Sequence, residues 1–138
     1  GFLKEAHQRG ATFLDHKLLH YYWNDVRHKV VMIDWNIGHW MPDKFSPEVQ
    51  ASDMIQFSSR ALHHIFTGRQ APGTVAVGPN RPEDIANSPT HYKASYSFDV
   101  QNRLNASELK FLETALDGGY QTPDAMIEAL EKLALERA

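Results

Sequence analysis

Apolar residues in much of this chain recur every three or four positions, which is the spacing of an amphipathic helix. The pattern predicts three helices, at about residues 53–67, 106–116 and 123–134. The first of them has the widest apolar face, which comprises Met54, Ile55, Ala61, Leu62, Ile65 and Phe66. We therefore expect this helix to be central and largely buried.

Capping signals mark where two of these helices begin and end. Ser52 or Asp53 is expected to cap the first helix, and Gly68 to end it. Asn105 is followed three residues later by Glu108, which is the pattern of a capping box at the start of the second helix.

The first third of the chain has a different pattern. Leu18–Trp23 and Lys29–Ile33 are short apolar and aromatic runs, and Asn24-Asp25 between them is a turn signal, so this region predicts a β-hairpin. Phe2–Arg9 resembles the last turns of a helix that Gly10 ends. Because a helix this short is marginal alone, we expect the chain to be a piece of a longer protein.

The remaining segments complete a mainly α fold with a small β-hairpin, in one domain over residues 1–138. Ser46-Pro47-Glu48 predicts a separate short helix, with serine as its cap and proline in its first turn. The proline-rich stretch 70–89 predicts a long loop held in place by Val75 and Val77.

Composition narrows the class of protein. The 138 residues carry a net charge of −3 and contain no long block of lysine and arginine, which argues against a nucleic-acid partner. No apolar run approaches the roughly 20 residues that span a bilayer. The chain has no cysteine, which fits a reducing compartment, so we expect a cytoplasmic protein.

Two aspartates are the candidate chemical groups. Asp15 lies in the loop that precedes the predicted hairpin, and Asp34 follows its second strand. Phosphoryl-transfer enzymes place a catalytic base and a magnesium ligand on two such carboxylates. Without further motifs, the favoured interpretation of the same residues is a loop aspartate and a strand-end cap.

Five short motifs occur in an order that resembles the C-terminal lobe of a eukaryotic-type serine/threonine protein kinase of the bacterial style. They are Phe13–His20 for the catalytic loop H-R-D-x-K-x-x-N, Asp34-Trp35-Asn36 for D-F-G, Ser46-Pro47-Glu48 for A-P-E, Ser52-Asp53 at the central helix, and Phe66-Thr67-Gly68-Arg69 at its end. The resemblance covers nearly the whole chain. It implies a kinase-like C-lobe whose N-lobe is absent from these residues.

The resemblance also implies roles for individual residues. Asp15 corresponds to the base that accepts the substrate proton, and Lys17 to the residue that contacts the transferred phosphate. Asp34 corresponds to the magnesium ligand. Glu48 and Asp53 correspond to structural residues.

Several departures from the family pattern predict that phosphoryl transfer is impaired. The asparagine that helps to hold a second magnesium is His20, and magnesium prefers oxygen ligands. The histidine and arginine before Asp15 are Phe13 and Leu14, so the usual partner of a phosphorylated loop is lost. The segment from Asn36 to Phe45 contains no Ser, Thr or Tyr.

A further departure concerns Glu48. The arginine expected to pair with it is replaced by Gly119. Glu48 is therefore expected to lack its usual partner.

The sequence thus predicts a degenerate kinase-like domain, or pseudokinase, that acts as a regulatory module with a protein partner. Magnesium and ATP are expected only if an N-lobe exists in the full protein, and no cofactor is expected for this chain alone. One alternative is the C-lobe of a divergent but active ATP-dependent kinase. A weaker alternative is a stand-alone helical interaction domain with accidental motif matches.

Histidines and tryptophans leave further alternatives. His16 and His20 have the spacing of a helical metal pair, but we expect them on a loop, which disfavours a metal site. His63 and His64 must point to different sides of their helix, and one of them is expected to be a core histidine with a backbone partner.

Trp35 and Trp40 flank the short loop that follows the hairpin. They are expected to pack into the core. The alternative is an exposed aromatic patch on which a partner docks.

Overall fold

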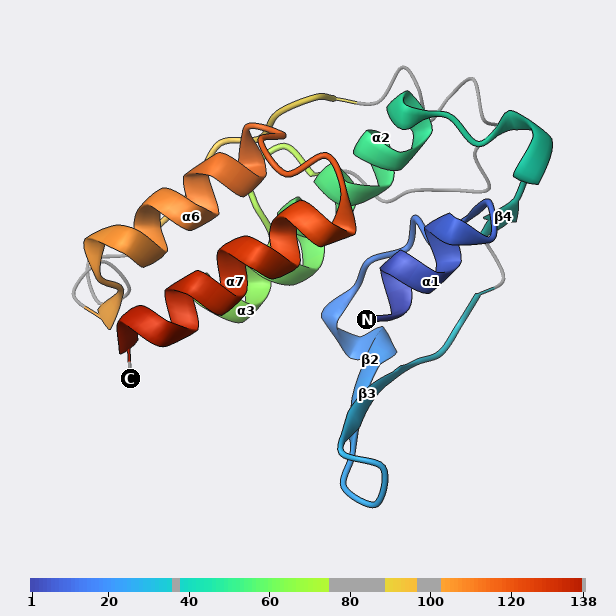
Figure 1. Ribbon diagram of the computed structural model, residues 1–138. Coiled ribbons are helices and arrows are strands. Elements are labelled where there is room, and N and C mark those ends of the chain that lie inside the picture. Colours follow the sequence, from blue (N-terminus) through green and yellow to red (C-terminus); the bar gives the residue numbers. More distant parts are fainter. Residues whose placement is uncertain (36–37, 75–88, 97–102, 138) are drawn as a thin grey trace.

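The computed structural model describes residues 1–35, 38–74, 89–96 and 103–137. They form a mixed, mostly helical small domain with two small two-stranded antiparallel sheets. Figure 1 shows the helices grouped together, with one hairpin extending away from them. The helices are α1 (Phe2–Gln8), α2 (Pro47–Phe57), α3 (His63–Thr67), α6 (Ala106–Leu116) and α7 (Pro123–Arg137).

A continuous helical run forms the centre of the domain. It starts with α2, passes through the π-helical segment η3 (Ser58–Leu62) and ends with α3 at Gly68, whose φ is 79°. The Ser46 hydroxyl accepts a hydrogen bond from the Val49 backbone N–H at 3.3 Å and caps the start.

The expectation that Ser52 or Asp53 caps a second helix is therefore wrong. The Ser46 cap and Pro47 at the first helical position start the helix early, and the run of residues that follows contains no glycine or further proline to interrupt it. Asp53 lies inside α2 and is fully buried, so its carboxylate is available to other segments.

The main core lies between the central helical run, α1, α6 and α7. Its buried side chains are Leu3, Phe13, Met54, Ile55, Leu62, Ala71, Tyr92, Phe111, Leu112, Ala115, Leu116 and Met126. The prediction of a wide apolar face on the central helix is confirmed, except that Ile65 is mostly exposed. A smaller cluster of Leu14, Met41 and Val49 lies under the N-terminal loop.

The predicted hairpin is present, with shorter strands. β2 (Tyr21–Asn24) pairs with β3 (Lys29–Met32) so that Tyr22 faces Val31 and Trp23 faces Val30. The Asn24 side chain accepts a hydrogen bond from the Arg27 N–H at 2.9 Å and closes the turn. Leu18–His20 forms one 3-10 turn instead of extending the first strand.

The second sheet is absent from the sequence prediction. β1 (Ala11–Thr12) pairs with β4 (His39–Trp40), with Ala11 opposite Trp40. Gly10 precedes this sheet with φ of 71°, and a Cβ there would lie 2.4 Å from the Pro42 Cα. Two-residue strands from distant segments have no periodic pattern of their own, so only the tertiary contact reveals them.

The prediction that both loop tryptophans pack into the core is wrong for Trp40, which is 77% exposed. Trp35 is also partly exposed, but its ring meets Phe13 edge-on at 4.9 Å. Val75 and Val77, which were expected to hold the long loop, lie outside the described residues.

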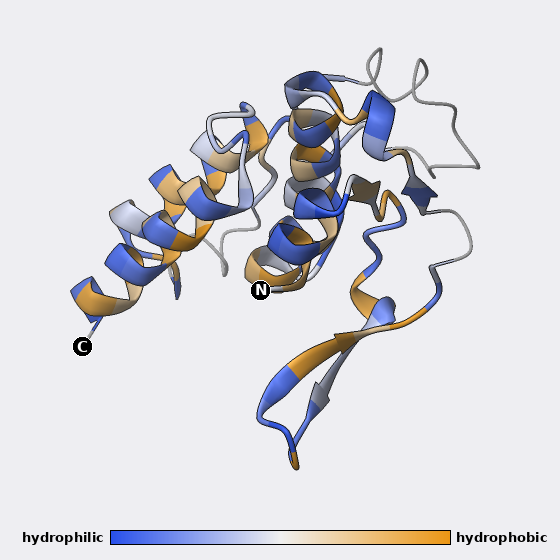
Figure 2. Ribbon diagram, turned by 45° about the vertical axis from the view of Figure 1, so that its right-hand side comes forward, coloured by the Kyte–Doolittle hydropathy of each residue, from blue (hydrophilic) through white to orange (hydrophobic). Residues whose placement is uncertain are grey.

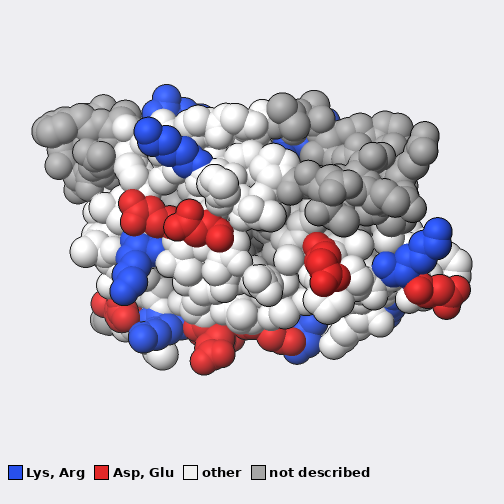
Figure 3. Space-filling model, turned by 90° about the horizontal axis from the view of Figure 1, so that it is seen from above, with Lys and Arg blue, Asp and Glu red and all other residues white. Residues whose placement is uncertain are grey.

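None of the helices in the described part of the chain has the length and apolar content needed to cross a bilayer. Figure 3 shows acidic and basic side chains interspersed over the face that it views.

His63 is the core histidine that the sequence predicted. It is fully buried, its Nδ1 lies 2.6 Å from the Arg69 carbonyl oxygen, and its Nε2 accepts the Ser95 backbone N–H at 3.2 Å. These two contacts fit the neutral ring with its proton on Nδ1. Burial lowers the pKa of His63, although the Arg69 carbonyl opposes that shift.

The lowered pKa predicts acid sensitivity. The unfolded chain takes up a proton at His63 near pH 6.5, whereas the folded chain resists it. The stability that the neutral, buried His63 contributes is therefore complete above that pH and declines below it. Denaturant unfolding at pH 7.5 and pH 5.5 should show a smaller loss of stability for His63→Asn than for wild type. The exposed His91→Asn variant should match wild type; equal losses in all three proteins would contradict the prediction.

The capping box of α6 is confirmed. The Asn105 side chain accepts the Glu108 N–H at 2.9 Å, and the Glu108 carboxylate accepts the Asn105 N–H at 2.8 Å. Each group satisfies a backbone donor that the helix leaves unpaired.

Removing this cap should weaken α6, which supplies four core residues. Asn105→Ala is expected to lower the free energy of unfolding by about 1 kcal/mol in a urea titration. Ser107→Ala, an exposed change in the same helical turn, should have a much smaller effect. Similar losses for both variants would show that the cap has no particular importance.

Candidate functional site

Four of the predicted site residues lie on three segments that meet beside the central helix. Asp15 and Lys17 follow β1 in a tight loop, His20 ends the 3-10 turn before β2, and Asp34 follows β3. The loop is compact because Asp15, His16 and Lys17 each donate a backbone N–H to the carbonyl oxygen two residues earlier.

The Asp53 carboxylate holds this loop against the central helix. One oxygen accepts the Leu14 N–H at 3.0 Å, and the other accepts the Phe13 N–H at 3.3 Å. Asp53 therefore accepts the backbone N–H groups of a segment about 40 residues away, and not those at the start of its own helix as the sequence predicted.

Two buried histidines complete the coordination of Asp53. His16 Nε2 lies 2.7 Å from one carboxylate oxygen and His7 Nε2 lies 2.8 Å from the other. His16 Nδ1 is 2.7 Å from the Tyr21 hydroxyl. Both histidines donate from Nε2 and satisfy the carboxylate, while the Tyr21 hydroxyl pairs with His16 Nδ1.

The pKa shifts of Asp53 and Tyr21 are consistent with this hydrogen-bond network. Burial alone raises the pKa of Asp53, but the attraction and hydrogen bond from His16, followed by those from His7, hold that pKa well below its usual value. Burial, and then the Asp53 charge, raise the pKa of Tyr21 far above its usual value. Asp53 is thus ionised and Tyr21 is protonated at neutral pH.

Two residues of the site have backbone angles that glycine usually adopts. Leu14 has φ of 66° and Asp34 has φ of 64°. Such angles cost energy in a residue with a Cβ and persist where the surrounding contacts enforce them. For Leu14 these contacts are the Asp53 hydrogen bond and complete burial.

Asp15 is paired with two cations. Its Oδ2 accepts a hydrogen bond from Lys17 at 2.9 Å, and its Oδ1 lies 3.4 Å from the Arg60 guanidinium. Asp15 is only 4% exposed. A base that takes a proton from a substrate must come within hydrogen-bond distance of it, and here the carboxylate is enclosed by its counter-ions.

Arg60 is the main site residue that the sequence analysis missed. It lies in the π-helical segment, it is almost completely buried, and its Nε and one terminal nitrogen make no hydrogen bond within the described residues. Segments of π-helix often occur at functional sites. Arg60 follows Asp53 by seven residues and Gln56 by four, so a helical projection could have placed all three on one polar stripe.

His20 occupies the space between the two predicted carboxylates. Its Nδ1 donates to the Asp15 carbonyl oxygen at 3.0 Å and lies 3.7 Å from the Asp15 carboxylate. Its Nε2 lies 3.5 Å from the Asp34 carboxylate. The imidazole is buried, whereas the Asp34 side chain is about half exposed.

The residues present do not fit the magnesium ion that the kinase resemblance implies. No group of three or more histidine, aspartate and glutamate side chains in the described segments is arranged to hold a metal ion. An imidazole lies where the family has an amide oxygen, and magnesium requires an oxygen-rich octahedral shell. The same finding argues against the His16–His20 metal pair, since His16 is bound to Asp53.

Glu48 lies apart from these groups. It is exposed in the first turn of α2, and hydrogen bonds from its own backbone N–H and then from Ser46 lower its pKa. No ion pair of Glu48 occurs among the residues that the structure describes.

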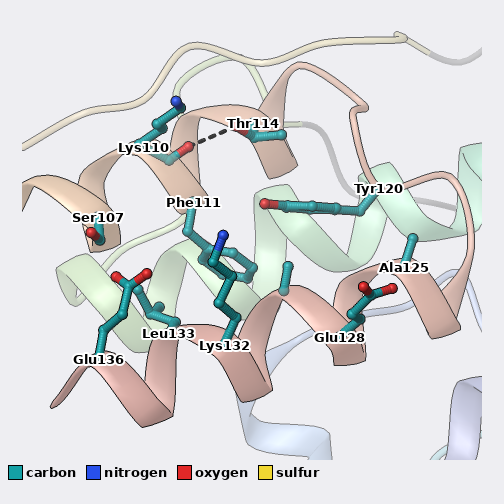
Figure 4. A pocket seen from close by; sticks show the side chains of 11 residues that line it. Ser107, Lys110, Phe111, Thr114, Tyr120, Ala125, Glu128, Lys132, Leu133 and Glu136 are labelled. Atoms are coloured by element: carbon teal, nitrogen blue, oxygen red, sulfur yellow. Dashed lines mark hydrogen bonds between the residues drawn. The ribbon is translucent and has the colours of Figure 1, made fainter.

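A pocket of about 490 Å³ lies elsewhere, between α6 and α7. Figure 4 shows Phe111 and Tyr120 inside it and the charged Lys132 and Glu128 of α7 along its side. The two aromatic rings stack at 5.3 Å. None of the predicted site residues lines this pocket, so it adds no group to the Asp15 site.

Comparison of this chain with protein-family models, curated proteins and solved structures gives no match.

The Asp53 network predicts a stability effect that a surface carboxylate cannot have. Asp53→Asn retains the size of the side chain but removes the charge that four donors share, so unfolding should become easier by about 3 kcal/mol or more. Asp43→Asn, an exposed change in the 3-10 turn before α2, should cost little. Thermal and urea unfolding measure both, and equal stability of the two variants would contradict the central role of Asp53.

Proposed function

We propose that this chain is a protein-kinase-like domain that is impaired in phosphoryl transfer and acts as a regulatory or interaction module. The proposal starts from the five ordered sequence motifs. It is supported by the meeting of Asp15 and Asp34, which come from separate segments, on either side of His20, with Lys17 paired to Asp15.

The position of His20 is the observation that carries the impairment. The imidazole contacts both carboxylates that a magnesium-dependent site would use, so a metal ion and this side chain compete for one space. Asp15 is also enclosed: its Oδ2 accepts a hydrogen bond from Lys17, and its Oδ1, which accepts none, is buried 3.4 Å from the Arg60 guanidinium, so a substrate hydroxyl has little access to the carboxylate. Both features oppose catalysis while they stabilise the loop.

The distribution of exposed apolar side chains supports an interaction role. Eight of the ten large hydrophobic residues that are exposed in the described residues lie in the interval 19–40. They are Leu19, Tyr22, Trp23, Val26, Val30, Ile33, Trp35 and Trp40. Such clustering marks binding surfaces more often than single exposed residues do.

Metal binding tests the impairment directly. Wild type should show no Mn²⁺ binding by titration calorimetry at millimolar concentration and no shift in melting temperature with Mg-ATP. His20→Asn removes the imidazole and adds an amide oxygen, so its Mn²⁺ affinity should rise by about tenfold or more, equivalent to 1.4 kcal/mol. The exposed His91→Asn variant is the matched control and should behave as wild type.

The same samples, and any longer form of the protein, should be tested for transfer of labelled phosphate to a protein substrate. Tight Mg-ATP binding with transfer by wild type would overturn the proposal in favour of an active, divergent kinase. Loss of that transfer in Asp34→Asn would then assign the metal to Asp34.

A further inference from the structure

The β2–β3 hairpin has an unpaired edge along β2, and the side chains of this edge differ from those of the β3 edge. Ile33 donates its N–H to the His20 carbonyl at 3.1 Å, so in the alternating pattern of an antiparallel pair Tyr22 and Asn24 also bond toward β3. Trp23, which lies between them, therefore directs its N–H and C=O away from β3. The sheet has two strands, so no third strand of the described chain meets these groups.

The side chains of this edge give it no charge or proline that would prevent pairing. Edge strands commonly carry lysine, proline or a bulge that prevents pairing with other chains. β3 begins with Lys29, but β2 is Tyr-Tyr-Trp-Asn and contains no charge. Tyr22 is 53% and Trp23 is 60% exposed. Figure 1 shows that the hairpin projects away from the helices, and Figure 2 shows the hydrophobic residues of its outer strand β3 in orange.

We propose that β2 pairs antiparallel with β2 of a second copy of this chain, about a two-fold axis at Trp23. In this register the two Trp23 residues exchange both backbone hydrogen bonds, and Tyr22 of each copy faces Asn24 of the other. The result is a four-stranded sheet with the two β3 strands outermost.

The register joins apolar surface to apolar surface and brings no like charges together on β2. Trp23 and Val30 are directly opposite within one hairpin and therefore share a face of the sheet. The two-fold places the Trp23 side chains next to each other, so Val30 and Trp23 of both copies form one apolar stripe. Lys29 lies on the outer strand of each copy, and no like charges are brought opposite each other on β2.

A second copy is also an occupant that uses up the β2 edge on both partners. Isologous pairing uses the same edge on both partners and leaves no free β2 edge for a third chain. A foreign strand would need its own complement to Tyr22 and Trp23, whereas the second copy supplies it by symmetry. The inference rests on the proposed role of residues 19–40 as an interaction segment, but not on impaired catalysis.

Sedimentation equilibrium tests the dimer. Wild type should change from monomer to dimer as its concentration rises through the micromolar range. Trp23→Lys would place two like charges at the axis and should weaken association by at least tenfold, equivalent to about 1.4 kcal/mol. Val26→Lys is the matched control, because Val26 is exposed in the turn of the same hairpin and lies outside both strands. It should dimerise as wild type does.

Amide hydrogen exchange gives a test that needs no variant. The Trp23 N–H should exchange slowly in concentrated wild type and rapidly in dilute wild type, whereas the Val30 N–H, on the outer edge, should be fast in both. A monomer at all concentrations, a dimer that Trp23→Lys leaves intact, or an unprotected Trp23 N–H in the dimer would each overturn the inference. Metal and ATP titrations decide the proposed impairment separately, so the two proposals fail on different measurements.

Discussion

The carboxylate of Asp53 is fully buried, and charge in such a place persists only where enough donors surround it. Two backbone N–H groups and two histidines provide these donors, from α1 and from the loop after β1. The positions of α1, that loop and the central helix are consequently coupled. Because the loop also holds Leu14 in a left-handed conformation, the rest of the site is built on this one contact.

Under the proposed function, the site keeps the geometry of a phosphoryl-transfer site without its chemistry. The loop presents Asp15 beside Lys17, and the hairpin returns Asp34 to the same neighbourhood through His20. Yet each acidic group is engaged with a side chain that stabilises the fold: Arg60 and Lys17 at Asp15, and His20 at Asp34. A scaffold can keep such an arrangement after catalysis is lost, because the ion pairs and hydrogen bonds have structural value of their own.

Exposed apolar side chains are unevenly distributed along the chain. The helices bury their apolar faces around one core, whereas residues 19–40 leave large side chains in solvent. A two-stranded hairpin cannot bury both of its faces and both of its edges by itself. The parts of this segment that contact the helices, such as Tyr21 near Phe57, are covered, whereas the projecting part is exposed to solvent.

The sequence by itself determined what depends on neighbours along the chain: the periodic helices, the Asn105–Glu108 box, the Ser46 start and the hairpin turn. These are local hydrogen bonds and local periodicities, so they can be read without the fold. The tertiary structure alone decided where Asp53 directs its carboxylate, that Arg60 faces Asp15, that β1 pairs with β4, and that Trp40 stays exposed. Each of these depends on segments far apart in sequence, and a buried charge is recognisable only when all its partners have been brought together.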